Sequence, residues 1–363
     1  MSVLKLGLMG FGSIAQLVHL PILTHLSGVE IAALAEIDPD RQEKARRYVP
    51  KAIIFDDYKK LLQMQEVEAV VICLPNALHA EAAIAALRQG KHVYLEKPIA
   101  ISLDEARNVL KVWNETNLNG MIGFNFRYHP IYQSAKQYIQ SERLGQLVYV
   151  HSIFSTVSQS QPECKQNRKT GGGALLDLAS HHIDLIHFLF DQEIQEVSAQ
   201  MRSFRSEDDH ALLQMRLANG LLIQSFFSIK TFEKDSFEIY GQTGKLALNR
   251  HHSLCMDVND PSLPFILFKL KQGFQKFTQL PDYFIKFLVP NYEPSFKAAL
   301  AHFISTIHKK QPPTPDFLDG YRSLLVIQGA EESARSGRIV SLRNLMNENF
   351  TTKPSGGNRT GLS

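Results

Sequence analysis

Residues 3–15, VLKLGLMGFGSIA, decide the fold of this chain. A mostly apolar run, typical of a buried strand, leads directly into GFGSIA at residues 10–15, where a helical pattern begins. Gly10 permits a tight turn, Gly12 lets the backbone approach a pyrophosphate, and Ala15 allows a helix to pack closely on the strand. The stretch therefore predicts a strand, a phosphate-binding turn and a helix, which is how a dinucleotide-binding domain begins.

The same alternation of short apolar runs and longer amphipathic runs continues to about Gly123. The expected strands are 3–10, 30–36, 52–55, 69–75, 92–98 and 120–125, and the expected helices are 13–26, 38–49, 79–90 and 102–117. Several strands are almost wholly apolar, as parallel strands are when helices cover both faces of their sheet. The pattern predicts an α/β fold with a doubly wound, parallel Rossmann sheet, in an NAD(P)-binding domain over residues 1–123.

The length and composition predict a two-domain protein. A chain of 363 residues exceeds what one hydrophobic core usually supports, so we expect a second, α+β domain over 124–350 and a disordered tail over 351–363. The net charge of +3, without a dense Lys/Arg stripe, argues against nucleic acid as a partner. No signal peptide or transmembrane segment is expected, and Cys73, Cys164 and Cys255 are too widely spaced for a disulfide framework, so the predicted location is cytoplasmic.

The second expected strand ends on an acid. Glu36 lies about twenty residues beyond the glycine-rich turn, where an acid binds the ribose hydroxyls of a dinucleotide. A carboxylate repels a 2′-phosphate, and Ile37 rather than a basic residue follows it, so the sequence favours NAD over NADP even with Arg41 nearby. The alternative is a strand, turn and helix that bind no ligand.

Two later strands end on residues that should face the same ligand, because ligands of such sheets bind beyond the carboxyl ends of the strands. Pro75 and Asn76 follow one strand, and Glu96, Lys97 and Pro98 follow the next. A lysine ammonium here could stabilise negative charge on a reacting oxygen, and the proline would make the backbone rigid, with a cis peptide as one form. A solvated lysine paired with Glu96 fits the position equally well.

Residues 171–190, GGGALLDLASHHIDLIHFLF, favour the catalytic interpretation. Asp177, His181 and Asp184 are four and three residues apart, which places them on one face of a helix. An Asp and a His within reach of one substrate supply a proton acceptor and a group that orients it. We therefore interpret Asp177 and His181 as functional residues.

The other histidines of this region have a plainer interpretation. His182 and His187 are expected to be core or surface residues. Adjacent residues such as His181 and His182 point to different faces of a helix and cannot easily share an ion, so no metal site is expected. RHHSLC at 250–255 likewise lacks the spacing of a zinc site.

After this helix the pattern predicts a mostly antiparallel, open-faced sheet with helices on one side. The expected strands lie in 196–204, 210–229, 236–249 and 253–258, hairpin turns lie at 217–222 and 241–246, and two amphipathic helices follow at 293–313 and 317–338. The open face of such a sheet needs cover, so we expect a homodimer or homotetramer formed through it.

Residues 261–292 are aromatic-rich, basic and longer than a connection requires. Lysines and prolines interrupt the apolar runs, so a membrane span is not expected. The segment fits a substrate lid, an oligomer contact or an interfacial element, with core or subunit packing as the favoured interpretation.

GFGSIA, Glu36, LPNALHAE, EKP, GFNFRYHP, GGGALLDLASHHID and EPSF together resemble the Gfo/Idh/MocA oxidoreductase family, which includes glucose-fructose oxidoreductases and inositol dehydrogenases, over nearly the whole chain. The resemblance implies that Lys97, Asp177 and His181 surround the reacting carbinol, with His181 as general base. It implies that the cofactor contacts Gly10, Phe11, Gly12, Ser13, Ile14, Glu36, Pro75, Asn76, His79 and Glu96, and that the substrate contacts Asn125 and Arg127. His79 alternatively supports its loop without touching the cofactor.

The implied reaction is reversible hydride transfer between NAD and a carbinol of a sugar, inositol or related polyol. Lys97, fixed by Glu96, would stabilise the developing negative charge on oxygen, and Asp177 would help orient the hydroxyl. Two other functions stay open, namely NAD-dependent glycoside cleavage through transient oxidation and a dinucleotide-sensing regulator. The presence of Lys97, Asp177 and His181 together argues against the regulator.

Overall fold

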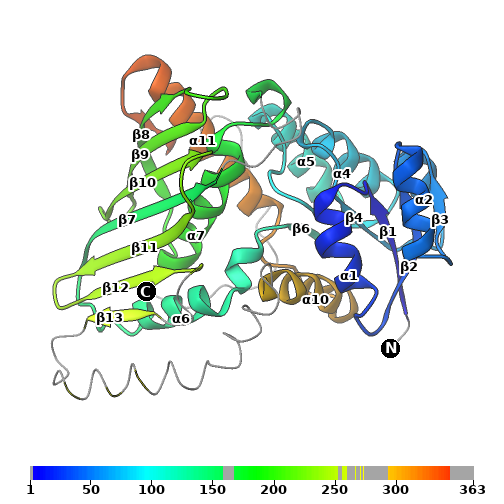
Figure 1. Cartoon of the computed structure of the whole chain (residues 1–363), viewed down its shortest axis with the longest axis horizontal. Coiled ribbons are helices and arrows are strands. Elements are labelled where there is room, and N and C mark those ends of the chain that lie inside the picture. Colours follow the sequence, from blue (N-terminus) through cyan, green and yellow to red (C-terminus); the bar gives the residue numbers. More distant parts are fainter. Residues whose placement is uncertain are drawn as a thin grey trace.

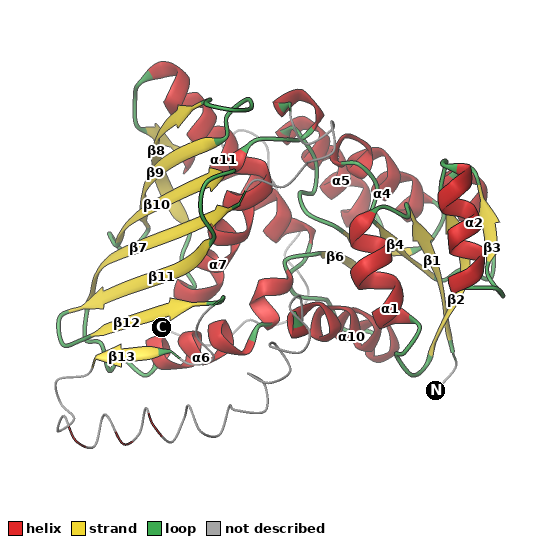
Figure 2. Cartoon of the chain, in the orientation of Figure 1, coloured by secondary structure: helices red, strands yellow, loops and turns green. Residues whose placement is uncertain are grey.

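The computed structural model describes residues 3–157, 167–251, 256–259 and 293–343, together with Ile266, Leu270 and Gly273. Two units lie side by side, each built on one sheet (Figure 1). Helices lie between the two sheets, and the second sheet turns one face away from them (Figure 2). This arrangement agrees with the predicted pairing of a parallel sheet with an open-faced, mostly antiparallel one.

The N-terminal sheet confirms the predicted doubly wound order. Its strands are β1 (Leu4–Met9), β2 (Val29–Ala35), β3 (Ile53–Phe55), β4 (Ala69–Ile72), β5 (His92–Leu95) and β6 (Gly120–Ile122). They are parallel in the order β3-β2-β1-β4-β5-β6. Met9 pairs with Ala35 on one side and Ile72 on the other, so the residues that follow these three strands meet at one edge, where a doubly wound sheet binds its ligand.

Helices cover this sheet on both faces, as its buried strands require. They are α1 (Leu20–Leu23), α2 (Pro39–Tyr48), α3 (Tyr58–Leu62), α4 (His79–Arg88) and α5 (Leu103–Asn114). Asp38, Asp57 and Ser102 cap the N-termini of α2, α3 and α5 by accepting hydrogen bonds from backbone N–H groups.

The first helix departs from the uniform α-helix expected over 13–26. A π-helical turn spans Ala15–His19, in which the Leu20 N–H reaches the carbonyl of Ala15. Pro21 follows at once, and its lack of a backbone N–H removes the i→i−4 hydrogen bond that an α-helix would form there. The wider turn changes which side chains face the sheet, and His19 is among those that are fully buried.

The C-terminal sheet is mostly antiparallel, as predicted. Its described strands are β7 (Leu147–Thr156), β8 (Ile194–Arg202), β9 (His210–Leu217), β10 (Leu222–Ile229), β11 (Lys234–Gly241), β12 (Lys245–Asn249), β13 (Asp257–Asn259) and β14 (Val340–Ser341). Their order is β13-β12-β11-β7-β10-β9-β8-β14, and β7 with β10 is the parallel pair among them. The hairpin turns expected at 217–222 and 241–246 join β9 to β10 and β11 to β12.

Four longer helices lie beyond residue 124 within the described residues, α6 (Pro130–Gln140), α7 (Ser180–Phe190), α10 (Pro294–Lys309) and α11 (Phe317–Ser336). α7 and α11 share a core with the sheet that includes Leu185, Phe227 and Leu325. α10 instead packs on the first sheet, where Leu300 and Phe303 share a core with strand residues such as Leu8. Residues after 124 therefore complete both cores.

Some sequence-based expectations fall outside the described residues. These are the tail 351–363, Cys164, Cys255, residues 252–255 and most of the segment 261–292. Within the part of the chain that the structure describes, no helix has the length and apolarity to cross a bilayer. The same residues hold no group of three or more His, Cys, Asp or Glu placed to bind a metal ion.

Two glycines of the first turn play different roles. Gly10 has a φ of +91°, and a Cβ added there would lie 2.7 Å from the backbone carbonyl oxygen of Cys73. A Cβ added at Gly12 would meet nothing within 4 Å. The fold therefore requires glycine at position 10, whereas at position 12 the added atom would project into open space.

We expect Gly10→Ala to lower the free energy of unfolding by about 1–3 kcal/mol, because a side chain strains this backbone conformation and meets a strand carbonyl. The matched variant Gly12→Ala should stay within about 0.5 kcal/mol of wild type. Urea denaturation of the two cofactor-free variants tests this difference, and equal losses at both positions would contradict it.

Candidate active site

Lys97 and Asp177 join the two units of the molecule. Lys97 follows β5, and its Nζ donates hydrogen bonds to the backbone carbonyl of Asp177 at 2.7 Å and to Asp177 Oδ1 at 3.1 Å. Both side chains are largely shielded, with 14% and 15% of their surface exposed. The peptide between Lys97 and Pro98 is cis, as the sequence suggested. A cation and a carboxylate that are far apart in the sequence therefore meet in one site that is largely shielded from solvent.

Asp177 reaches this position from a π-helical turn, Leu175–Ala179, which precedes α7. This turn corrects the expected helical face. A π-helical turn breaks the 3.6-residue periodicity, so a spacing of seven residues no longer places Asp177 and Asp184 on one helical face. Asp177, in the π-helical turn, contacts Lys97, whereas Asp184, on α7, is buried against Arg127.

His181 lies at the start of α7 in an aromatic setting. Its ring stacks on Phe126, with the centroids 4.3 Å apart, and Phe124 and Phe154 approach it edge-on. Nδ1 is buried and has no hydrogen-bond partner among the described residues. Burial holds the pKa of His181 well below its ordinary value, and the positive charges of Lys97 and Arg250 lower it further. The negative charges of Asp177 and Asp235 raise this pKa, but by less. The imidazole is therefore neutral at neutral pH and can accept a proton.

The sequence suggested that Glu96 pairs with the neighbouring Lys97, but the structure gives Glu96 a different hydrogen-bond partner. Its Oε1 lies 2.7 Å from Nε2 of His19, a residue that the motif analysis missed. Burial opposes ionisation of Glu96, but the hydrogen bond from His19 and the positive charge of Lys97 outweigh it and lower the Glu96 pKa. Glu96 is therefore a carboxylate held by the first helix.

The predicted dinucleotide residues surround the edge where β1 and β2 end. The Phe11 N–H donates to Glu36 Oε2 at 2.7 Å, and the Asp38 N–H donates to Oε1 at 3.0 Å, so both oxygens are anchored beside the glycine-rich turn. Arg41 Nη1 lies 3.9 Å from Oε2. Ser13 is exposed and Ile14 half-buried, both at the start of the first helix.

These residues fit a dinucleotide. The open space at Gly12 would admit a pyrophosphate next to the backbone, at a point where any side chain would intrude. The carboxylate of Glu36 stands at the end of β2, where an acid can accept hydrogen bonds from ribose hydroxyls. The geometry thus agrees with the expected cofactor, and the individual contacts stay predictions.

The loop after β4 connects this edge to the second unit. Pro75 precedes a short 3-10 turn at Asn76–Leu78, and Asn76 Nδ2 donates to the carbonyl of Gly171 at 2.8 Å. The His79 ring is buried, with Nδ1 2.6 Å from the carbonyl of Pro98 and Nε2 2.9 Å from that of Leu74. His79 therefore braces two loops, which favours its supporting role.

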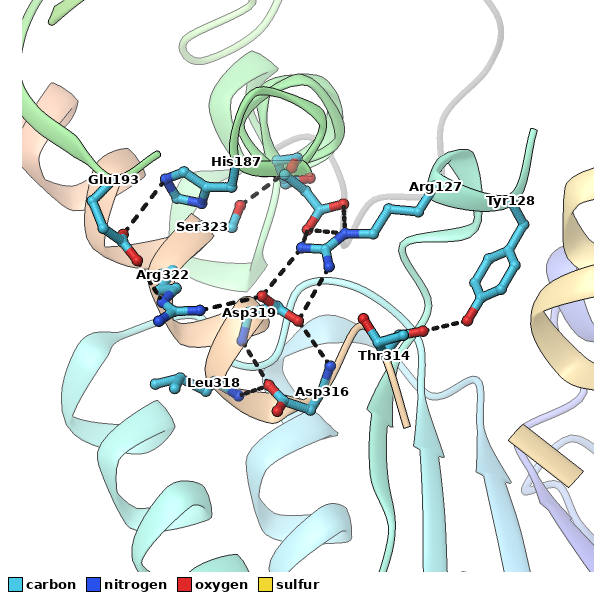
Figure 3. Close-up of polar contacts among 12 residues, drawn as sticks. Arg127, Tyr128, His187, Glu193, Thr314, Asp316, Leu318, Asp319, Arg322 and Ser323 are labelled. Carbon is cyan, nitrogen blue, oxygen red and sulfur yellow. Dashed lines mark hydrogen bonds and ion pairs between the residues drawn. The ribbon is translucent and has the colours of Figure 1, made fainter. Parts of the chain in front are cut away.

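Arg127, expected at the substrate, lies in a buried ion-pair cluster (Figure 3). Its Nε and Nη2 contact both carboxylate oxygens of Asp184 at 2.6–3.1 Å, and Nη2 lies 3.2 Å from Asp319 Oδ1 on α11. Burial raises the pKa of Asp184 to about 7, although the positive charge of Arg127 acts in the opposite direction. Burial likewise opposes ionisation of Asp319, yet Arg127 outweighs it and the Asp319 pKa is lowered. The Arg127 guanidinium thus pairs with two carboxylates and connects its own segment to α7 and α11.

Asn125, the other expected substrate residue, is also buried. Its Nδ2 donates to Ser295 Oγ at 2.8 Å, which attaches it to the start of α10, and its Oδ1 has no partner among the described residues. The structure therefore gives Asn125 and Arg127 contacts that hold the fold, and their contact with a substrate stays a prediction.

A second buried network lies behind His181 and was not predicted. The adjacent His182 is a core residue, as expected, with Nε2 3.1 Å from Asp235 Oδ1. Arg250 Nε donates to Asp235 Oδ2 at 2.6 Å, its Nη1 donates to Glu293 Oε2 at 2.7 Å, and its guanidinium lies 4.1 Å from the centre of the Phe126 ring. This network anchors α7 to the sheet and supports the ring on which His181 stacks.

His187, expected to be a core or surface residue, lies near the end of α7 with 9% of its side-chain surface exposed. Burial lowers the pKa of His187 to about 3, with Arg322 and Arg127 lowering it further. The ring is therefore neutral and lies in the cluster shown in Figure 3.

Known proteins resemble this chain over most of its length. Residues 4–124 match the oxidoreductase family with an NAD-binding Rossmann fold, and residues 132–247 match the GFO/IDH/MocA C-terminal domain. Inositol 2-dehydrogenase of Salmonella typhimurium is 26% identical, over 93% of this chain and 97% of its own length. A dTDP-3,4-didehydro-2,6-dideoxy-alpha-D-glucose 3-reductase of Actinomadura kijaniata is 29% identical, over 68% of this chain and 75% of its own.

Solved structures share the fold. Levoglucosan dehydrogenase in complex with NADH and levoglucosan superposes with a TM-score of 0.80 at 21% identity, covering 93% of this chain and 99% of the other. The WlbA dehydrogenase of Bordetella pertussis, in complex with NADH and UDP-GlcNAcA, superposes with a TM-score of 0.80 at 19% identity, covering 94% and 98%. Both sheets of this chain therefore have counterparts in oxidoreductase structures.

We expect Arg127→Met to lower the free energy of unfolding by about 3–5 kcal/mol, because Asp184 and Asp319 would stay buried without their cation. Arg216→Met is the matched control, since Arg216 pairs with Glu196 at the surface, and it should cost about 1 kcal/mol or less. Chemical denaturation measures both values. A residue that served only the substrate would leave the stability of Arg127→Met equal to that of the control.

Proposed function

This chain belongs to the GFO/IDH/MocA family of oxidoreductases, and from that premise we propose that it transfers a hydride reversibly between a nicotinamide dinucleotide and a carbinol carbon. The substrate class is a sugar, inositol or sugar derivative. The observation that carries the proposal is the meeting of Lys97 with Asp177, from the two units, in the site where the neutral His181 stacks on Phe126.

Each of the three residues has a role that follows from its chemistry. His181 is neutral because it is buried, so it can take the hydroxyl proton as the hydride leaves. Lys97 places a positive charge beside the oxygen on which negative charge develops. Asp177 holds that ammonium by hydrogen bonds and helps to orient the substrate hydroxyl. The site thus separates proton acceptance from charge stabilisation.

NAD is the proposed cofactor, and when bound it supplies the hydride acceptor at its nicotinamide ring. The backbone at Gly10, Gly12 and neighbouring residues would hold the pyrophosphate, and Glu36 would accept hydrogen bonds from the ribose. The anchored carboxylate of Glu36 argues against a 2′-phosphate, because two negative charges would meet there. NADP is therefore the less favoured cofactor.

Named relatives support the substrate class in general terms. The inositol 2-dehydrogenase, the dTDP-sugar reductase and levoglucosan dehydrogenase all have names that refer to polyhydroxylated or sugar-derived compounds. Two alternatives use the same fold and cofactor, namely glycoside cleavage by transient oxidation and dinucleotide sensing without turnover. Release of a leaving group without accumulation of NADH would identify the first, and NAD binding without any turnover would identify the second.

We further propose a homodimer or homotetramer through the C-terminal sheet, in a protein of the cytoplasm. The sheet's outward side chains include Tyr149, Leu222 and Phe226, which alternate with buried residues along β7 and β10, and Leu222 has 53% of its surface exposed. A second copy on this face would remove that apolar surface from water. Light scattering of the purified protein gives the oligomeric state.

The proposed reaction is tested with a panel of polyols, aldoses, inositols and nucleotide sugars, with NAD or NADP, by the absorbance of the reduced nicotinamide. We expect one substrate class to give a signal. Lys97→Ala should bind NADH but lose turnover by about a hundredfold to a thousandfold, because it lacks the charge that stabilises the oxygen. The exposed Lys111→Ala is the control. Unchanged turnover in Lys97→Ala would remove Lys97 from the mechanism.

The acid side of the pH profile reports on His181. A base must be unprotonated, and a lowered pKa keeps His181 unprotonated to a lower pH than an exposed histidine. We therefore expect kcat/KM for the alcohol to stay level as pH falls from about 8 to about 6, and to decline only below that. A decline centred at about 6.5 or above would contradict the role given to buried His181.

A further inference from the structure

His19 is a buried, titratable residue that the proposed mechanism does not use. It closes the π-helical turn Ala15–His19, directly after the glycine-rich turn, and it has no exposed surface. Its Nε2 lies 2.7 Å from Oε1 of Glu96, which precedes Lys97 at the end of β5. A single hydrogen bond therefore joins the helix of the dinucleotide site to the strand end that carries the catalytic lysine.

The surroundings of His19 decide which atom donates. Tyr94 and Phe296 approach the imidazole edge-on, with centroids 5.7 and 5.8 Å away, and so enclose it in aromatic rings. Nδ1 is buried and has no hydrogen-bond partner among the described residues. A proton on Nδ1 would be an unsatisfied buried donor, whereas a proton on Nε2 faces a carboxylate. His19 therefore donates from Nε2 to Glu96.

Glu96 is restrained on several sides by this arrangement. Its N–H donates to the carbonyl of Ile72, which fixes the backbone at the end of β5. The carboxylate lies over Gly123, where an added Cβ would come within 3.1 Å of both oxygens. Within the described part of the chain, His19 supplies the hydrogen bond to Oε1, and Oε2 accepts none. Oε2, on a side chain that is 12% exposed, is thus left for a ligand.

We propose that His19 is a positioning residue, which orients Glu96 toward the dinucleotide and holds the Glu96-Lys97-Pro98 turn against the first helix. This inference rests on the proposed function, because it needs a dinucleotide at the edge of the N-terminal sheet. Without the Nε2 donor, the Glu96 carboxylate would be buried against Gly123 with no hydrogen bond from the protein. The pH dependence of dinucleotide binding then reveals whether His19 acts through the charge of Glu96.

The test compares His19→Leu with His19→Gln by titrating NADH fluorescence between about pH 5 and pH 8. The glutamine amide can place a donor near the position of Nε2, so His19→Gln should keep wild-type affinity within about threefold and the same level pH profile. His19→Leu should bind NADH about tenfold more weakly at neutral pH. Its affinity should fall further as pH decreases, since burial then raises the pKa of Glu96 without the opposing hydrogen bond.

Two further variants separate a positioning role from a general loss of stability. If His19 acts through Glu96, the double variant His19→Leu/Glu96→Gln should bind NADH no more weakly than Glu96→Gln alone. Thermal unfolding of the cofactor-free proteins shows whether His19→Leu folds. If it does not, His19→Asn, whose shorter amide does not reach Glu96, takes its place with the same expected weakening and pH dependence.

The outcomes distinguish this inference from the proposed function. Wild-type affinity in His19→Leu would overturn the inference alone, and so would an equal loss in His19→Gln and His19→Leu with no change of pH profile. Failure of the wild-type protein to bind either NADH or NADPH would overturn the proposed function and this inference together. A pH-dependent loss in His19→Leu that His19→Gln restores supports the positioning role.

Discussion

The contact between Lys97 and Asp177 is the constraint on which the rest of the site depends. The ammonium stands at the end of a strand in one sheet, and the carboxylate stands on a helical turn packed against the other, so the contact requires the two units to keep one relative position. Two further contacts act across the same boundary. Asn76 donates to the carbonyl of Gly171, and both Nη atoms of Arg168 lie 3.3 Å from the carbonyl of Ile101. The proposed active site therefore depends on how the two units pack together.

Buried charge around α7 is compensated on both sides of the helix. Arg127 joins Asp184 to Asp319 of α11, while His182 joins the helix to Asp235 and Arg250 at the sheet. Such pairs contribute little net stability when compared with apolar packing, but removing one partner leaves a charge that is costly to bury. Their effect is to allow one position of α7, and with it one position of His181 against Phe126.

Two π-helical turns explain why helical periodicity was a limited guide. One follows the glycine-rich turn and ends on His19, and the other carries Asp177 just before α7. In each, the turn holds more residues than an α-helical turn, so side chains beyond it face a direction that the 3.6-residue repeat does not predict. The first turn presents His19 to Glu96, and the second presents Asp177 to Lys97, in each case as a hydrogen-bond partner.

The sequence by itself determined the two sheets, the glycine-rich turn, the acid at Glu36 and the placement of Lys97 at a strand end. These features follow from local patterns, because strand burial, turn conformation and the position of a strand end all depend on residues that are neighbours in the sequence. Only the tertiary structure decided that Glu96 contacts His19, that Arg127 contacts Asp184 and Asp319, and that His182 contacts Asp235. Those partners are more than fifty residues apart in the chain, and a buried charge selects its partner by proximity and desolvation, which local sequence patterns do not record.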